Sequence, residues 1–338
     1  MRGRKQCVRV DNSISSYLDV VSGVPQGSIL GPLLFSVFIN DLPDCVSNCC
    51  PHLFADDVQT AKTFSPDHAT VALSELNEDL DRISNWSSDN GLSLNVDKCQ
   101  HIIIGSQQLF QNNPLSDICH FNSVFINNDK LKTYLQVKNL GVLFDQHLSW
   151  DAHITSQCRL ALQRVRYLCK FKNFLSKKTK RKLASSLILP LLDYCDSVYY
   201  NAAKGLLNMV QKVQNACVRF MLNIKKRDSV RDCFKGIKWL TMEKRRSLHS
   251  LLLIYKILKF EEPSYLFDLF NSSLTNHSYS TRLNSNISFT PPRPRTTKYS
   301  NSFLVQSMKS WNDLPEAIKG APTVQSFKSR AFRHLLNS

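Results

Sequence analysis

Phe54-Ala55-Asp56-Asp57 ends a short apolar run, and the strand-like stretch Val58-Gln59-Thr60-Ala61 follows directly. Adjacent residues on one strand point to opposite faces, whereas a tight turn after Ala55 places both acids at one hairpin tip. Carboxylates held together repel each other and stay ionised beside a strong cation, usually Mg²⁺. The local pattern therefore predicts a metal-binding hairpin over residues 52–63. A solvated Asp-Asp turn is the alternative.

A glycine-rich loop precedes the acidic pair and leads into an apolar stretch. Gly23 and Gly27 allow a backbone to pass close to a ligand, and Pro25 stiffens the loop between them. Ser28 is a candidate cap for a helix expected over residues 29–43. The apolar face expected for that helix consists of Leu33, Leu34, Val37, Phe38 and Leu42. Such a loop suits a phosphate or a sugar–phosphate backbone, and a helix entry without a ligand is the alternative.

Periodicity along the rest of the chain predicts an α+β fold followed by a helical region. Apolar residues that recur every three or four positions from Leu73 to Trp86 indicate an amphipathic helix that ends at Gly91. Strands are expected at 92–96, 101–104, 122–126, 133–137 and 140–144. A helix among antiparallel hairpins is typical of an α+β fold and not of a doubly wound sheet. Further helices are expected from about 150, from Ser176, and over 205–222, 241–260 and 323–336.

The net charge of +16 is unevenly distributed. Residues 1–130 hold 8 Lys/Arg against 15 Asp/Glu, whereas residues 131–338 hold 35 against 12. A basic surface of that size implies a polyanionic partner and binding that weakens with salt, and a merely soluble basic protein is the alternative. The run Lys177-Lys178-Thr179-Lys180-Arg181-Lys182 is consistent with a nucleic-acid groove, a nuclear-localisation signal or a solvated helix start.

Composition narrows the class of protein. No apolar run reaches about 18 residues and the N-terminus lacks a signal-peptide core, so an intracellular protein without a membrane partner is expected. The 11 cysteines are scattered without CxxC pairs or matching histidines, which argues against zinc and favours reduced thiols.

Several motifs together resemble a reverse transcriptase. GVPQGSILGPLLF at 23–35, about twenty residues before Phe54-Ala55-Asp56-Asp57, resembles motif B, and the acidic pair resembles motif C. Trp86, the stretch 90–95 and Lys98 resemble motif D, and the stretches 139–144 and 148–154 resemble motif E and its continuation. The family is that of jockey-like non-LTR (LINE-type) retrotransposons. The resemblance spans essentially the whole chain and is looser after about residue 155.

This resemblance implies a domain organisation and an activity. A partial polymerase palm, with an antiparallel sheet plus helices, is expected over 1–150. A helical, thumb-like basic region over 151–270, a linker over 271–300 and a C-terminal helical segment over 301–338 follow. The implied activity is RNA-directed DNA polymerase, with an RNA template, a DNA primer, dNTPs and Mg²⁺. A nuclear location is implied for the parent element.

The resemblance also assigns roles to residues. Asp56 and Asp57 become catalytic metal ligands, and Lys98 becomes a catalytic lysine that protonates or neutralises the leaving pyrophosphate. Phe54 is expected to pack in the palm core. The nucleotide and template pocket is implied to include Pro25, Gln26 and Gly27, and the primer grip Leu140 and Gly141. The nucleic-acid-binding helix start is implied to use Lys177, Lys178, Lys180, Arg181 and Lys182.

One part of the family's metal site has no counterpart in the sequence. Two Mg²⁺ ions about 3.5–4 Å apart need a further aspartate, which the family supplies from motif A, several dozen residues before motif B. Only 22 residues precede Gly23. The chain is therefore interpreted as the C-terminal part of a reverse transcriptase, without fingers or motif A and with little activity alone. The alternatives are a non-catalytic nucleic-acid-binding remnant or host-recruited protein, and a group II intron maturase or telomerase-like enzyme.

Overall fold

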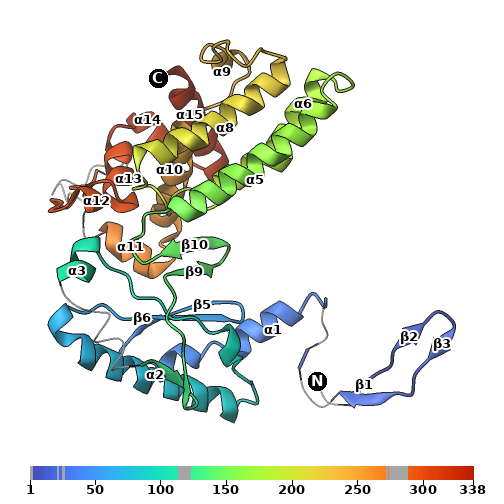
Figure 1. The fold of residues 1–338 in the computed structure, drawn as a ribbon, viewed down its shortest axis with the longest axis vertical. Coiled ribbons are helices and arrows are strands. Elements are labelled where there is room, and N and C mark those ends of the chain that lie inside the picture. The colour runs from blue at the N-terminus through green and yellow to red at the C-terminus, as the bar shows by residue number, and fades with distance from the viewer. Residues whose placement is uncertain (1–2, 21–22, 25–26, 113–122, 272, 274–287) are drawn as a thin grey trace. The chain divides into compact units, whose positions relative to one another are not determined.

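The computed structural model describes residues 3–20, 23–24, 27–112, 123–271, 273 and 288–338. They form two compact units, Met1–Val137 and Lys138–Ser338, coloured from blue to red along the chain in Figure 1. Helices and two-stranded sheets alternate in the first unit, and helices dominate the second. The chain is thus a mixture of helices and small antiparallel sheets, consistent with the α+β class. No helix in the described ranges combines the length and apolar character needed to cross a membrane.

The first unit begins with two nested antiparallel strand pairs and a short helix. The outer pair joins β1 (Arg4–Gln6) to β4 (Leu18–Val20), and the inner pair is the hairpin of β2 (Arg9–Val10) and β3 (Ser13–Ile14). Helix α1 (Gly31–Phe38) and the 3₁₀ turn η1 (Leu42–Cys45) follow. The face predicted for this helix is wrong in part, because Leu33 and Val37 are exposed while Phe35, Ile39 and Leu42 pack inward.

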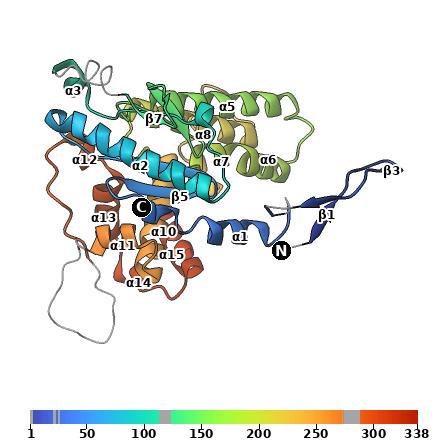
Figure 2. The same ribbon diagram turned by 90° about the horizontal axis from the view of Figure 1, so that it is seen from below.

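Helix α2 (Ala69–Asp89) organises the rest of the first unit, after the 3₁₀ turn η2 (Pro66–His68). Through Ile83 it packs with Leu42 and with the hairpin of β5 (Cys50–Phe54) and β6 (Asp57–Ala61). Through Leu73 it packs against the hairpin of β7 (Phe125–Ile126) and β8 (Asp129–Lys130). Figure 2 shows the long α2 beside β5. The predicted hairpin and helix are both confirmed.

Two predicted strands of this unit are wrong. Residues 92–96 and 101–104 form no strand; the 3₁₀ turn η3 (Val96–Lys98) and a single bridge from His101 to Thr133 stand there instead. Leu94 and Val96 contact the clusters around α2, so their apolar character reflects packing and not sheet pairing. Helix α3 (Gln107–Asn112) follows.

The second unit starts with the hairpin of β9 (Gln136–Asn139) and β10 (Val142–Asp145), followed by a helical layer. Its first helices are α5 (Asp151–Lys170), α6 (Lys177–Leu183), the π-helical turn η4 (Ala184–Ile188), α7 (Leu189–Asp193) and α8 (Lys204–Leu222). The π-turn precedes Pro190, whose ring cannot fit a regular α-helical turn. One apolar core joins α5, η4, α7 and α8.

A second core of this unit gathers the C-terminal helices on α10 (Met242–Phe260). They are α11 (Ser264–Asn271), α13 (Phe303–Asn312), α14 (Glu316–Lys319) and α15 (Val324–Asn337). The short helix α9 (Cys233–Gly236) packs through Phe234 in the first core, and α12 (Thr297–Ser300) precedes α13. The rings of Tyr255, Phe327 and Trp311 stack at its centre. Much of the expected linker, residues 272 and 274–287, lies outside the described residues, but Phe289 is buried in this core.

Candidate active site

The acidic pair occupies the tip of the β5–β6 hairpin. Phe54 faces Asp57 as the last strand pair, so Ala55 and Asp56 form a two-residue turn. Ala55 has a φ of 52°, in the left-handed region. A tight hairpin turn requires this backbone conformation, which residues other than glycine rarely adopt. Both carboxylates are exposed to solvent. The turn therefore presents two acids on adjacent residues at one point of the surface.

Phe54 does not pack in the core, contrary to its predicted role. Its side chain is 63% exposed, whereas Leu53 and Val58, paired across the hairpin, face the cluster that holds Ile83. Side chains alternate along a strand, so placing Leu53 inward turns Phe54 outward. Because directly paired residues share a face, Phe54 and Asp57 lie together on the open side of the hairpin.

The carboxylates of Asp56 and Asp57 make no hydrogen bond or ion pair with another described residue. Their oxygens are therefore free to bind a hard cation, which prefers carboxylate ligands. In the described part of the chain, the one group of three His, Cys, Asp or Glu side chains with ligand spacing is Asp193, Asp196 and His249, in the second unit. Asp56 and Asp57 thus fit Mg²⁺ as a pair, without a third acid beside them.

Asp79 anchors the segment that leads into the hairpin, and sequence reasoning missed it. Its fully buried carboxylate accepts backbone N–H groups from Ser47 (3.1 Å), Asn48 (2.8 Å) and Cys49 (2.8 Å), and pairs with Arg82 at 2.6 Å. Burial opposes ionisation of Asp79, but these N–H donors outweigh it and lower its pKa. The sequence signal for this role is the position of an acidic residue among the apolar positions of α2.

Lys62 makes a second connection between this loop and α2. Its ammonium donates to the carbonyl of Asn48 at 2.8 Å and pairs with Glu75 at 2.6 Å, and the Glu75 carboxylate raises the pKa of Lys62. Burial, reinforced by Asp79, raises the pKa of the neighbouring Cys49 thiol to about 11. Both ends of the hairpin are therefore fixed to one helix, which makes α2 the platform of the acidic tip.

The glycine-rich loop is described only in part. Pro25 and Gln26 lie outside the described residues. Gly27 has a φ of 79°, which favours glycine, and a Cβ built there would meet nothing within 4 Å. The Ser28 hydroxyl accepts the N–H of Gly31 at 3.0 Å, but the N-cap position of α1 is Leu30, so the prediction that Ser28 caps this helix is wrong. Arg4 donates to the carbonyl of Gly23 at 2.6 Å and holds the other side of the loop.

Lys98 belongs to the first unit, and the predicted primer-grip turn belongs to the second. Lys98 is exposed at the end of η3 and makes no hydrogen bond or ion pair with Asp56 or Asp57. Leu140 and Gly141, with φ values of 44° and 84°, form the turn between β9 and β10. The Tyr194 hydroxyl donates to the Leu140 carbonyl at 2.5 Å, and a Cβ on Gly141 would come within 3.3 Å of its ring.

The predicted basic helix start divides into a surface set and one core residue. The surface set consists of Lys177, Lys178, Arg181 and Lys182. Lys180 is only 3% exposed; its ammonium donates to Asn223 at 2.8 Å and lies 5.9 Å from the centroid of the Phe220 ring. As the fourth residue of a helix packed on α8, Lys180 faces that helix and cannot join the exposed set.

A polar cluster in the second unit was not foreseen from the sequence. Arg245 binds both carboxylate oxygens of Asp193, and His249 contacts Asp196 at 2.7 Å. Arg246 lies over the ring of Tyr199, whose pKa burial raises. Because Arg245 already neutralises Asp193, this cluster fits a bridge between α7 and α10 better than a metal site. Acids beside the apolar run of α7 were the only sequence signal.

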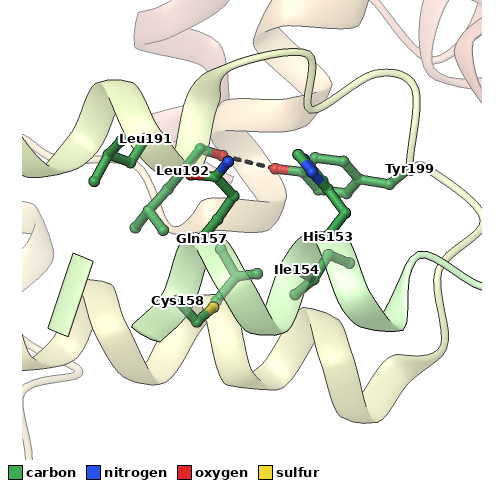
Figure 3. A pocket seen from close by; sticks show the side chains of 8 residues that line it. His153, Ile154, Gln157, Cys158, Leu191, Leu192 and Tyr199 are labelled. Atoms are coloured by element: carbon green, nitrogen blue, oxygen red, sulfur yellow. Dashed lines mark hydrogen bonds between the residues drawn. The ribbon is translucent and has the colours of Figure 1, made fainter. Parts of the chain in front are cut away.

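A small cavity beside this cluster is too small for a substrate. Figure 3 shows its lining, in which His153, Gln157 and Tyr199 supply the polar groups. Its volume is about 10 Å³, enough for a single water molecule. The Leu143 N–H donates to His153 Nδ1 at 3.3 Å, and burial lowers the pKa of His153. This cavity therefore belongs to the packing of α5 and not to catalysis.

Comparison with known proteins agrees with the motif analysis. Residues 3–144 match the family described as reverse transcriptase (RNA-dependent DNA polymerase). The chain is 32% identical over 228 residues to the RNA-directed DNA polymerase from mobile element jockey of Drosophila funebris, covering 64% of this chain and 24% of that protein. The Drosophila melanogaster protein of the same description is 30% identical over 223 residues, covering 63% and 23%.

A further relative supports the same grouping. The probable RNA-directed DNA polymerase from transposon BS of Drosophila melanogaster is 27% identical over 267 residues, covering 74% of this chain and 27% of that protein. The chain thus spans about a quarter of the length of these relatives. No solved structure matches it significantly. The predicted resemblance to jockey-like reverse transcriptases is confirmed.

Proposed function

Since residues 3–144 match the reverse transcriptase family and the chain is similar to jockey polymerases, we propose that it works in RNA-directed DNA synthesis. The observation that carries this proposal is the acidic pair at the hairpin tip. Asp56 and Asp57 are exposed and adjacent, and their carboxylates have no hydrogen-bond or ion-pair partner among the described residues, on a hairpin fixed to α2 by Asp79. The proposed substrates are an RNA template, a DNA primer and dNTPs.

In this proposal Asp56 and Asp57 hold Mg²⁺, which reverse transcriptases generally use. Bound there, the ion supplies charge stabilisation to the phosphate oxygens that react. The left-handed turn at Ala55 sets the direction of both carboxylates, and the anchored loop at 47–49 limits their movement. A two-metal site needs a third carboxylate. We propose that this third ligand is not one of the residues described above around Asp56 and Asp57.

The other predicted roles are assigned on the same basis. Lys98, exposed and unpaired among the described residues, is proposed to give a proton to the departing pyrophosphate or to neutralise it. Gly27, together with Pro25 and Gln26, is proposed to leave room for a nucleotide or template strand. The tight turn of Leu140 and Gly141, fixed by Tyr194, is proposed to lie against the primer backbone.

A second candidate function is nucleic-acid binding without catalysis. Its support is the charge of the second unit, where ten Lys and Arg and no Asp or Glu occur over residues 152–192. Such a surface binds phosphates regardless of any polymerase chemistry.

The experiment that separates the two functions is primer extension by the full chain on an RNA template with Mg²⁺. Asp56→Asn and Asp57→Asn each remove one charged ligand at constant size, and Asp89→Asn, also exposed, serves as the control. Polymerase function predicts extension that both hairpin variants lose and the control keeps. Extension that survives both hairpin variants contradicts the assigned site. RNA binding without extension by the unmodified chain favours the second function.

A further inference from the structure

The segment from 152 to 192, which runs from the second residue of α5 through α6 and η4 into α7, carries charge of one sign only. It contains ten Lys and Arg and no Asp or Glu. Nine of the ten are exposed: Arg159, Arg164, Arg166, Lys170, Lys172, Lys177, Lys178, Arg181 and Lys182. Clustered cations without neutralising acids create a strong positive potential, which attracts polyanions.

Three aromatic side chains are exposed within this basic segment. Tyr167 is 61% exposed, Phe171 45% and Phe174 87%. Tyr167 lies in the last turn of α5, and Phe171 and Phe174 lie in the turn that follows this helix. The rings of Tyr167 and Phe171 meet edge to face with centroids 5.6 Å apart, and the Lys170 ammonium lies 5.9 Å from the Tyr167 ring. We call Tyr167, Phe171, Phe174 and the nine exposed cations the aromatic–basic tip.

The backbone that carries these rings is well anchored. The opposite face of α5, with Ala161, Val165 and Leu168, lies in the core shared with α8. The turn after α5 closes through a hydrogen bond from Phe174 N–H to the Phe171 carbonyl at 3.0 Å, and Ser176 then caps α6. In Figure 1 this turn lies at the end of the helical layer formed by α5 and α6. The rings are therefore exposed on a rigid base.

We propose that the aromatic–basic tip binds the unpaired bases of a single-stranded nucleic acid. The cations contact the phosphates, and the aromatic rings stack on base faces, which are open in a single strand and covered by neighbours inside a duplex. Charge alone explains attraction to any polyanion, but three exposed rings among nine cations match a partner that alternates phosphates with flat apolar bases. The inference deepens the proposed function, since a polymerase that copies RNA must hold template beyond its paired region.

The test is fluorescence anisotropy of the full chain with a labelled single-stranded RNA, a single-stranded DNA and a blunt duplex of equal length. Phe174→Ala is expected to weaken single-strand binding by about 5- to 150-fold, the range for losing one base–aromatic stack, and to leave duplex binding and the salt slope unchanged. Phe174→Trp should restore it. Phe260→Ala removes another exposed ring, 55% exposed at the end of α10, and should change nothing.

The cations give a complementary readout. Lys177→Gln combined with Lys178→Gln is expected to weaken single-strand and duplex binding alike and to reduce the salt slope by about two. Circular dichroism of each variant checks that the helices stay folded. We therefore expect the ring variants to lose single-strand binding alone, and the cation variant to lose single-strand and duplex binding alike.

Three outcomes would overturn the inference. Equal losses of affinity for the single strand and the duplex in Phe174→Ala would show that the rings do not stack on unpaired bases. Unchanged nucleic-acid binding by both Phe174→Ala and Tyr167→Ala would show that the rings do not contribute to binding. Phe174-dependent binding to phosphatidylserine vesicles, without such dependence for RNA, would identify a membrane surface instead. Failure of primer extension with intact single-strand binding would favour the second candidate function and leave this inference standing.

Discussion

Replacing Asp79 by Asn should loosen the acidic hairpin without touching it. Asp79 is buried on α2 and holds the loop that enters β5 through three backbone N–H groups, those of Ser47, Asn48 and Cys49. Asn has nearly the same volume, so packing against α2 is kept. It lacks the charge, and its amide group would face N–H donors that it cannot pair with. The loop should therefore detach from α2 more often.

The expected magnitude follows from the bonds that are lost. A hydrogen bond to a charged group contributes about 1.5–3 kcal/mol. An Asn oxygen in the place of Oδ2 can keep the bonds from Asn48 and Cys49, whereas the bond from Ser47 and the pairing with Arg82 at Oδ1 are lost. The loss of these two interactions, offset by water that reaches the open loop, gives about 3 kcal/mol for local opening. That free energy corresponds to roughly a 150-fold larger population of the open loop.

Hydrogen exchange followed by mass spectrometry measures this opening directly. Amides of residues 49–54 should exchange about 100-fold faster in Asp79→Asn than in the unmodified chain, while those of α8 keep their rates. Asp81→Asn, two residues further along α2 and exposed, is the matched control and should behave like the unmodified chain. Equal exchange in both variants would refute the anchoring role of Asp79.

Three further predictions concern turns and acid stability. Ala55→Gly should stabilise the hairpin by up to about 1 kcal/mol, because glycine accepts the left-handed φ of 52° without strain, and slower exchange of β5 amides would show it. Gly141→Ala should destabilise the second unit by about 1–2 kcal/mol in urea unfolding, because a Cβ at a φ of 84° also meets Tyr194; an unchanged midpoint would contradict this. Burial opposes ionisation of Asp145, but N–H groups from Ser149 and its neighbours outweigh it and lower its pKa, so its stabilisation is present above about pH 3.9 and is lost as pH falls through the lowered pKa. Asp145→Asn should therefore flatten the fall in unfolding free energy between about pH 4 and 2, measured by urea titrations at each pH.

The sequence predicts elements whose pattern is local and misses those set by distant contacts. The hairpin at Asp56 and the helix from Ala69 to Asp89 follow from turn chemistry and from the spacing of apolar residues, and both are present. Residues 92–96 show how a short apolar stretch misleads, because Leu94 packs beneath α2 without any strand partner. Periodicity cannot distinguish the two cases in so few residues.

The sequence predicts the position of the acidic pair and not the residues that support it. The pair Asp56 and Asp57 could be located from their neighbours in sequence. Asp79, in contrast, acts on residues about thirty positions away, and its place among the apolar positions of α2 signals its burial without identifying those residues. Lys180 shows the opposite error: its basic neighbours suggest a surface role, but the turn of the helix places it against Asn223. Such residues are recognised only when the packing partner is known.

Because the cores of the two units differ in size, the two units should unfold at different temperatures on heating. The clusters of the first unit are built on four and three buried apolar residues, against twenty-five and fifteen in the second, counted over the described residues. The unit with less buried apolar surface should melt first, so unfolding should not be two-state. Most of the helical signal arises from the second unit, so ellipticity should persist after the acidic hairpin has already come apart. A sample that appears folded by circular dichroism can then have lost its acidic hairpin tip, and a melting temperature read from helicity would overestimate the thermal limit of that tip.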